Sequence, residues 1–327
     1  MGEVLEKELM TVGRLAPSPT GALHLGNIRT FMVSWLSARS KSGKVIMRME
    51  DLDHPRDKPF ADREIVETLK WLGFDWDESH VQSARRDLYR AKLNMLGDKI
   101  YPCVCSRRDV ESAQSAPHEG EQLFYPGTCR GRFSSWREAV LFNLDRGKAA
   151  LPCWRFSTCA AVRGKVAFED VFSGRYEQDV AETLGDFPLA RDEDGAGYTF
   201  ACLVDDIEMG VTEVVRGADL LGVTPAQMIL ADELYPGRSI SYCHIPLVVG
   251  PDGKRLAKRH GDTRISTFRQ SGISAEKIIS FLAETLGWCE KGEVLTLEKL
   301  IPRFTLKTIP KKNLILTKFP IVSNPKI

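Results

Sequence analysis

The sequence predicts an α/β protein organised around a doubly wound parallel sheet, because short apolar runs alternate along the chain with helical patterns. Residues 10–15 are apolar enough for a buried strand, and apolar side chains recur at helical spacing over residues 28–36. A second apolar run covers residues 44–49, and residues 61–73 carry a helical pattern that ends at a glycine. Alternating strands and helices favour parallel pairing, since each helix returns the chain to the same edge of the sheet.

The segment between the first strand and the first helix has the composition of a ligand-binding loop. Residues 15–27 contain two prolines and two glycines, so the backbone can approach a ligand closely. The helix N-terminus that follows suits a phosphate group. His24 and Asn27 lie where such a loop presents donors to a nucleotide. An ordinary connection between a strand and a helix is the alternative interpretation.

The composition sets limits on the class of protein. A chain of 327 residues, 43% of them hydrophobic, is long enough for one or two domains with a substantial core. No apolar run approaches the roughly 18 residues of a membrane span, and the acidic N-terminus lacks the features of a secretory signal. Eight dispersed cysteines favour a reduced, cytoplasmic setting over a disulfide scaffold. The net charge of +1 gives no overall indication of nucleic-acid binding.

Three cysteines flank a polar loop in the middle of the chain. Cys103 and Cys105 precede this loop, and Cys129 follows it. Thiolates in this arrangement can hold zinc, which replaces the hydrophobic core that such a loop lacks. General zinc chemistry favours His118 as the fourth ligand, with Tyr125 a chemically unusual candidate. Free thiols packed in a core are the alternative.

Charged residues follow several of the apolar runs. Glu50 comes directly after the second predicted strand, where parallel sheets bind ligands, although a solvated strand exit is the alternative. Residues 198–206 end in paired acids, and we interpret them as another buried strand that meets a site. Arg216 follows an apolar run and could bind a carboxylate through two parallel hydrogen bonds. A surface ion pair with Asp219 is its alternative role.

The last third of the chain is rich in basic residues. Residues 250–262 form a Gly-rich basic loop that suits a polyphosphate, with a solvated turn or an RNA-contacting patch as alternatives. From Lys299 onward there are seven Lys or Arg residues and no Asp or Glu. We expect this part to be a frayed tail, with a tRNA-contacting arm as the alternative.

Three of these segments resemble motifs of one enzyme family. Residues 24–27, His-Leu-Gly-Asn, resemble the "HIGH" element of class I aminoacyl-tRNA synthetases. Residues 13–21 are similar to the opening of glutamyl-tRNA synthetases, and residues 255–259 resemble the "KMSKS" loop, with Ala257 in place of the usual serine. The matched elements run in the family's order over residues 12–265. The resemblance implies a Rossmann-like catalytic domain with an inserted zinc-containing lobe and a short helical C-terminal part.

The resemblance also implies domain boundaries and site residues. The expected parts are two halves of the catalytic domain at 10–100 and 191–265, an inserted lobe at 101–190, and a C-terminal segment with a basic tail at 266–327. The residues that would bind glutamate are Arg14, Leu15, Ala16, Pro17, Ser18, Glu50, Tyr198 and Arg216. The residues that would bind ATP, with its Mg²⁺, are His24, Gly26, Asn27 and Lys258, of which His24 and Lys258 are also the catalytic candidates.

The cysteine pattern and the length narrow the resemblance to glutamyl-Q tRNA(Asp) synthetases, which lack the anticodon-binding region of the longer enzymes. In that family one structural zinc is held by residues matching Cys103, Cys105, Tyr125 and Cys129. The implied activity is transfer of glutamate to queuosine in the anticodon of tRNA(Asp), by a cytoplasmic monomer. The alternatives are a short glutamyl-tRNA synthetase that charges a tRNA 3′ end, and a non-catalytic zinc-containing protein that binds RNA or a nucleotide.

Overall fold

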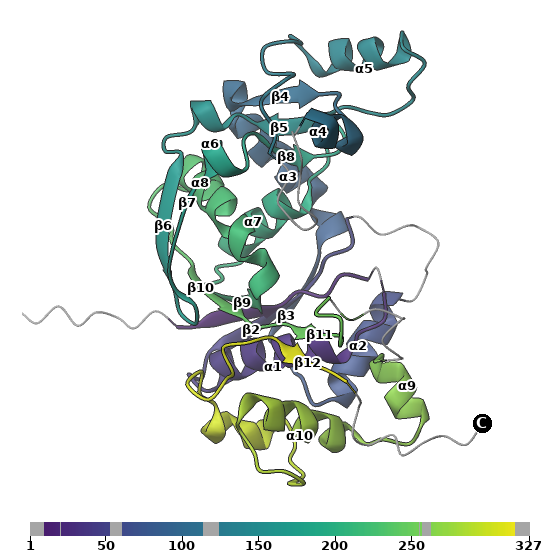
Figure 1. Ribbon diagram of the computed structural model, residues 1–327, viewed down its shortest axis with the longest axis vertical. Helices are drawn as coiled ribbons and strands as arrows, with labels where there is room; N and C mark the ends of the chain where they lie inside the picture. Colours follow the sequence, from purple (N-terminus) through teal and green to yellow (C-terminus); the bar gives the residue numbers. More distant parts are fainter. Residues whose placement is uncertain are drawn as a thin grey trace, which may run out of the picture.

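A parallel sheet lies at the centre of the molecule, as the sequence predicts (Figure 1). The computed structural model describes residues 10–19, 21–52, 61–113, 124–254, 256 and 263–317. Three strands pair in parallel, in the order β1 (Val12–Leu15), β2 (Lys44–Met49) and β3 (Glu78–Val81). Two further parallel strands are β9 (Glu213–Gly217) and β10 (Ser241–Ile245). The start of β9 lies beside β1, because the amide of Thr212, the residue before β9, donates to the carbonyl of Val12 at 3.0 Å.

Helices cover both faces of the sheet. On one face α1 (Leu25–Arg39) and α10 (Ala275–Leu286) pack with side chains of β1 and β2 in the largest hydrophobic cluster. On the other face lie α7 (Tyr198–Glu208) and α8 (Thr224–Leu234). The remaining α-helices are α2 (Ala61–Trp71), α3 (Arg86–Met95), α4 (Arg107–Ala113), α5 (Trp136–Leu144), α6 (Val180–Thr183) and α9 (Ile265–Gln270). Short 3-10 helices cover Gln82–Arg85, Gly97–Lys99, Thr158–Ala160, Ala218–Val223 and Glu298–Arg303. In the part of the chain that the structure describes, no helix is long and apolar enough to cross a bilayer.

A separate lobe is inserted between the two halves of the sheet (Figure 1, upper part). Its antiparallel sheet has the order β4 (Ile100–Cys103), β5 (Cys153–Phe156) and β8 (Phe187–Ala190). A hairpin of β6 (Lys165–Asp170) and β7 (Gly174–Asp179) leads from this sheet back toward β10. The lobe therefore differs from the central sheet: its strands pair antiparallel, and antiparallel strands need no helical crossovers between them.

The prediction of a strand over residues 198–206 is wrong, because this segment belongs to helix α7. Every residue from Phe200 to Ile207 is buried, so the helix has no polar stripe to give the sequence a helical period. A fully apolar run of this length does not distinguish a buried strand from a buried helix. The paired acids at its end are consequently helix residues: Asp206 contacts the arginines of the sheet, whereas Asp205 accepts from Gln82, Arg85 and Tyr89.

The expectation of a frayed C-terminal tail is wrong for residues 299–316. Leu300, Ile309 and Leu316 are buried in the main hydrophobic cluster. A short strand, β12 (Leu314–Ile315), pairs in parallel with β11 (Val248–Val249). Apolar residues spaced between the lysines anchor this segment, so its positive charge alone did not predict whether the segment is folded. Residues 318–327 lie outside the described part of the chain.

Candidate functional site

The carboxyl ends of the parallel strands open into a cavity of about 650 Å³. Almost all of the described residues that the sequence nominates for glutamate or ATP line it: Arg14, Ala16, Pro17, Ser18, His24, Gly26, Asn27, Glu50, Tyr198 and Arg216. Leu15 is the exception, because its side chain points to the opposite face and is fully buried in the core. Its side chain therefore does not line the cavity, and its place in the glutamate-binding segment stays a prediction. Lys258 falls outside the described residues.

The alternation of side chains along the strands builds a polar face on the sheet. Leu15 on β1 and Val215 on β9 belong to the cluster that includes α1, whereas their neighbours Arg14 and Arg216 point to the other face. On β2, Arg48 also points to this other face, and its side chain is completely buried. This face of the sheet therefore carries three arginines toward the strand ends, where the cavity lies.

Acidic side chains of α7 neutralise two of these arginines. Asp206 Oδ1 lies 2.6 Å from Arg48 Nη1 and 3.4 Å from Arg14 Nε. Arg48 Nη2 also contacts Glu50 Oε1 at 3.0 Å, and the Cys202 thiol donates to the same oxygen at 3.1 Å. Burial opposes the charge on Arg48, but the carboxylates of Asp206 and Glu50 outweigh it and hold the pKa of Arg48 well above its usual value. The network fixes Glu50 and Arg14 at the edge of the cavity.

Arg216 is held differently, by neutral acceptors. Its Nε donates to His244 Nε2 at 3.0 Å, and its Nη2 donates to Thr224 Oγ1 at 2.8 Å and to Gln227 Oε1 at 2.7 Å. These contacts replace the ion pair with Asp219 that the sequence offered as an alternative. The buried Nη1 has no hydrogen-bond partner among the described residues. Arg216 lines the cavity, and its Nη1 keeps two N–H donors without a partner among the described residues.

His24 closes the N-terminus of α1 next to this cavity. Its Nδ1 accepts from the amides of Gly26 and Asn27 at 3.1 and 3.4 Å, and Asn27 Oδ1 accepts from the amide of His24 at 3.0 Å. The two side chains therefore form a capping box. Because Nδ1 accepts, it holds no proton, and Nε2 is the protonated nitrogen of the neutral ring. The segment after the basic loop is attached here, since the amide of Leu25 donates to the carbonyl of Thr263 at 3.2 Å.

A second cluster of chemically active groups lies in the inserted lobe. The sulfur atoms of Cys103, Cys105 and Cys129 lie within 4.8 Å of one another. Tyr125 Oη lies 3.2 Å from the sulfur of Cys103 and 3.6 Å from that of Cys105, and it accepts from the amide of Cys129 at 2.9 Å. Cys105 and Cys129 have their sulfurs 3.6 Å apart, close to the roughly 3.8 Å expected for two thiolates on one tetrahedral zinc. The geometry of these four donors fits a zinc ion. His118 lies outside the described residues.

The surroundings of this cluster favour a thiolate at Cys103, whereas the neighbouring sulfurs raise the pKa of Cys105 and burial raises the pKa of Tyr125. Arg155 Nε lies 3.2 Å from Cys103 Sγ, and its guanidinium sits 3.8 Å from the centre of the Tyr125 ring. Hydrogen bonds from Cys105 and Cys129, together with the charge of Arg155, lower the pKa of the Cys103 thiol. Cys103 is also directly opposite Cys153 in the pairing of β4 with β5, which the spacing of the cysteines did not indicate.

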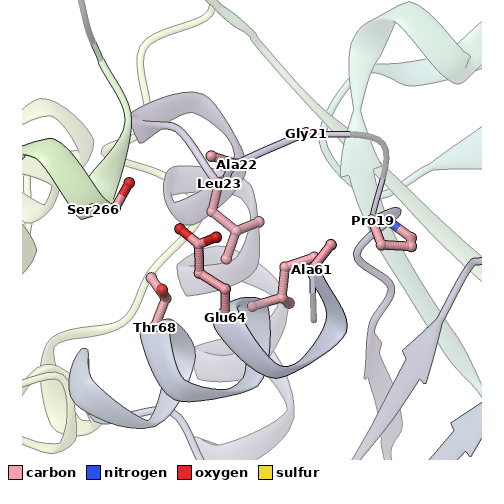
Figure 2. Close-up of a pocket in the computed structure, with 9 residues that line it drawn as sticks. Pro19, Gly21, Ala22, Leu23, Ala61, Glu64, Thr68 and Ser266 are labelled. Carbon is pink, nitrogen blue, oxygen red and sulfur yellow. The ribbon is translucent and has the colours of Figure 1, made fainter. Parts of the chain in front are cut away.

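A smaller cavity of about 150 Å³ lies beside the same loop but contains none of the nominated residues. Figure 2 shows Leu23 of the loop, Glu64 and Thr68 of α2 and Ser266 of α9 around it. Gly21, Ala22 and Leu23 line both cavities, so the loop forms a wall between them. The larger cavity remains the candidate site, because the charged and capping groups converge there.

The fold and this cavity define the class: an α/β protein whose ligand site lies at the carboxyl ends of parallel strands. The model of the catalytic domain of class I tRNA synthetases (E and Q) matches residues 10–318. The chain belongs to this family, which confirms the resemblance seen in the sequence.

Individual relatives agree with the family match. The chain is 42% identical to a glutamyl-Q tRNA(Asp) synthetase of Rhodopirellula baltica, over 92% of each chain. It is 40% identical to another protein of that name from Symbiobacterium thermophilum, over 93% of this chain and 95% of the relative. Among solved structures, it superposes on a glutamate tRNA ligase from Elizabethkingia meningosepticum with a TM-score of 0.74 and 27% identity, over 94% of this chain and 67% of the other.

Sequence reasoning missed several residues that shape the site. Asp206 was predicted to sit at a strand end, and its contact with two arginines depends on the helix that was not foreseen. His244 and Asp170 lie in different parts of the chain and meet only in the folded protein. The one available signal was a histidine inside the apolar strand β10, where a polar side chain needs a partner.

Proposed function

We propose that this chain activates glutamate with ATP to form glutamyl-adenylate and then transfers glutamate to queuosine in the anticodon of tRNA(Asp). One observation carries the proposal: Arg14, Arg216 and Glu50 line a single cavity that also contains the capped N-terminus of α1. The guanidinium of Arg216 suits the side-chain carboxylate of glutamate, and the carboxylate of Glu50 suits its ammonium group, while Arg14 borders the same space and is paired with Asp206. Similarity to glutamyl-Q tRNA(Asp) synthetases over more than nine-tenths of their length supports the choice of acceptor.

In this proposal Arg216 binds the side-chain carboxylate of glutamate through Nη1, which has no other partner among the described residues. Glu50 binds the ammonium group through the oxygen that Arg48 and Cys202 leave unused. Tyr198 and Arg14 border the same space. The remaining wall is backbone and small side chains of Ala16, Pro17 and Ser18. The α-carboxylate is left to face the ATP subsite.

The ATP subsite lies at the other end of the loop. His24 Nε2–H and the N-terminus of α1 stabilise negative charge on the phosphates. Gly26 leaves room for the His24 ring, because a Cβ at this position would lie 3.0 Å from His24 Cε1. Asn27 keeps the cap in place. The α-carboxylate attacks the α-phosphorus and pyrophosphate leaves, while the protein contributes positioning and charge stabilisation. We assign Lys258 to the leaving pyrophosphate on the resemblance alone, and Mg²⁺ enters with ATP.

We also propose that Cys103, Cys105, Tyr125 and Cys129 hold one structural zinc in the inserted lobe. When bound, the metal cross-links strand β4 to the segment around residue 125. The boundaries expected from the sequence, at residues 100, 190 and 265, remain our proposal for the parts of the molecule. A monomer acting in the cytoplasm is part of the same proposal.

Two assays on the purified protein test the function. Glutamate-dependent exchange of pyrophosphate into ATP is expected, and its absence at any glutamate concentration would overturn the enzymatic proposal. Labelled glutamate is then offered with tRNA(Asp) that carries queuosine and with the same tRNA transcribed without modification. Label is expected only on the modified tRNA and, after nuclease digestion, in the anticodon fragment. Label in the 3′-terminal adenosine would refute the choice of acceptor.

A further inference from the structure

A chain of three buried groups leads from the inserted segment to the cavity. Asp170, the last residue of β6, has Oδ2 2.6 Å from Nδ1 of His244 on β10, and the two residues are 74 positions apart in the sequence. On the other side of the ring, His244 Nε2 accepts from Arg216 Nε at 3.0 Å. The side chains of His244 and Asp170 are fully buried. Arg216 is the only one of the three that lines the cavity.

The chemistry of the contacts fixes the protonation of His244. The guanidinium of Arg216 only donates, so the ring nitrogen that faces it must be bare. The single ring proton then sits on Nδ1, where the Asp170 carboxylate accepts it. Burial lowers the pKa of His244, and the positive charges of Arg216 and Arg14 add to this effect against the opposing influence of the Asp170 carboxylate.

Asp170 is itself held rigidly. Its Oδ1 accepts from the amides of Phe172 and Ser173 at 3.1 and 2.8 Å, and the amide of His244 donates to both carboxylate oxygens at 3.1–3.2 Å. The carboxylate can therefore neither rotate away from the ring nor lose its role as acceptor without breaking a turn. It also stays one residue removed from Arg216, so it does not neutralise the guanidinium by direct contact.

We infer that Asp170 and His244 form a positioning pair that fixes the guanidinium of Arg216 and thereby sets the affinity for the substrate's side-chain carboxylate. The inference rests on the proposed function, since it takes glutamate as the ligand of Arg216. The pair aligns Nη1 by orienting Nε, whereas Thr224 and Gln227 hold Nη2. Because the acceptors of Arg216 are neutral, its full charge remains available to the substrate.

The test compares three substitutions of His244 in the glutamate-dependent exchange assay. His244→Gln places an amide oxygen near the position of Nε2 and keeps an acceptor for Arg216. His244→Asn keeps a polar group near Asp170 but does not reach Arg216, and His244→Leu offers neither contact. We expect the KM for glutamate to rise about 10- to 100-fold in the Asn and Leu variants, and to stay within about threefold of wild type in the Gln variant. The KM for ATP should not change in any of them.

A matched control separates positioning from stability. Cys243→Ala removes a buried side chain from the opposite face of the same strand, where it packs in the cluster with α1. It should lower the melting temperature without changing the KM for glutamate. The inference of a positioning pair would be overturned by equal effects of the Asn and Gln substitutions on the KM for glutamate, or by an unchanged KM in the Leu variant. In either case, exchange by the wild type would still support the proposed function. Absence of exchange in the wild type would instead overturn the proposed function itself, and direct titration of glutamate into the variants would then decide the role of the pair.

Discussion

Replacing Glu50 with glutamine isolates the proposed contact with the substrate's ammonium group. Both side-chain hydrogen bonds of Glu50 within the described residues fall on Oε1, at 3.0 Å from Arg48 Nη2 and 3.1 Å from Cys202 Sγ. Oε2 has no hydrogen-bond partner among the described residues, and Glu50 lines the cavity. A hydrogen bond between charged groups is worth about 1.5–3 kcal/mol, so its loss in Glu50→Gln should raise the KM for glutamate about 10- to 150-fold.

The same substitution has a cost in stability that can be bounded. Arg48 keeps Asp206 at 2.6 Å and Asp205 at 3.9 Å, so its charge stays compensated after Glu50 becomes neutral. The loss should then resemble that of one hydrogen bond to a charged group, about 1.5–3 kcal/mol, rather than the larger cost of an unpaired buried charge. Urea unfolding followed by circular dichroism measures it.

The assay is glutamate-dependent pyrophosphate exchange, with KM determined separately for glutamate and for ATP. Cys202→Ala is the matched control, because it removes the thiol donor to Oε1 but leaves the carboxylate and should change the KM for glutamate by no more than about threefold. If the Glu50→Gln variant folds and its KM for glutamate equals that of wild type, the ammonium contact is refuted.

Three further outcomes follow from the structure. His24→Asn should keep the helix cap and the melting temperature but reduce pyrophosphate exchange. His24→Ala should also reduce exchange and, because the cap is lost, should cost about 1 kcal/mol of stability in urea unfolding. Equal exchange in the wild type and the Asn variant would exclude a role for the imidazole. Cys105→Ser should lower the zinc content measured by atomic emission and the stability of the lobe, while exchange stays within about threefold because no donor of the cluster lines the cavity. Leu300→Ala should cost about 2–5 kcal/mol in urea unfolding, since Leu300 is fully buried; a cost near zero would restore the picture of a frayed C-terminal segment.

The parts of the site that the sequence predicted are those in which neighbours in the chain act together. The loop of residues 15–27 could be recognised because its turns, cap and helix start are local, and His24 and Asn27 of the cap are three positions apart. Cys103 and Cys105 were recognised for the same reason. The helix over residues 198–206 was not recognised, because its residues 200–206 are all buried and have lost the polar pattern that would reveal the helical period.

The polar face of the sheet could not be foreseen, since it depends on which residues the fold brings opposite one another. In the pairing of β9 with β10, Arg216 lies directly opposite His244, and Val215 lies opposite Cys243. A slip of one residue along either strand would place an apolar side chain against the cavity and bury the arginine among the residues that pack on α1. The apolar residues between the charged ones thus determine more than stability. By requiring burial against α1, they fix the register that points Arg216 at the cavity, and the same alternation on β1 directs Arg14 to it.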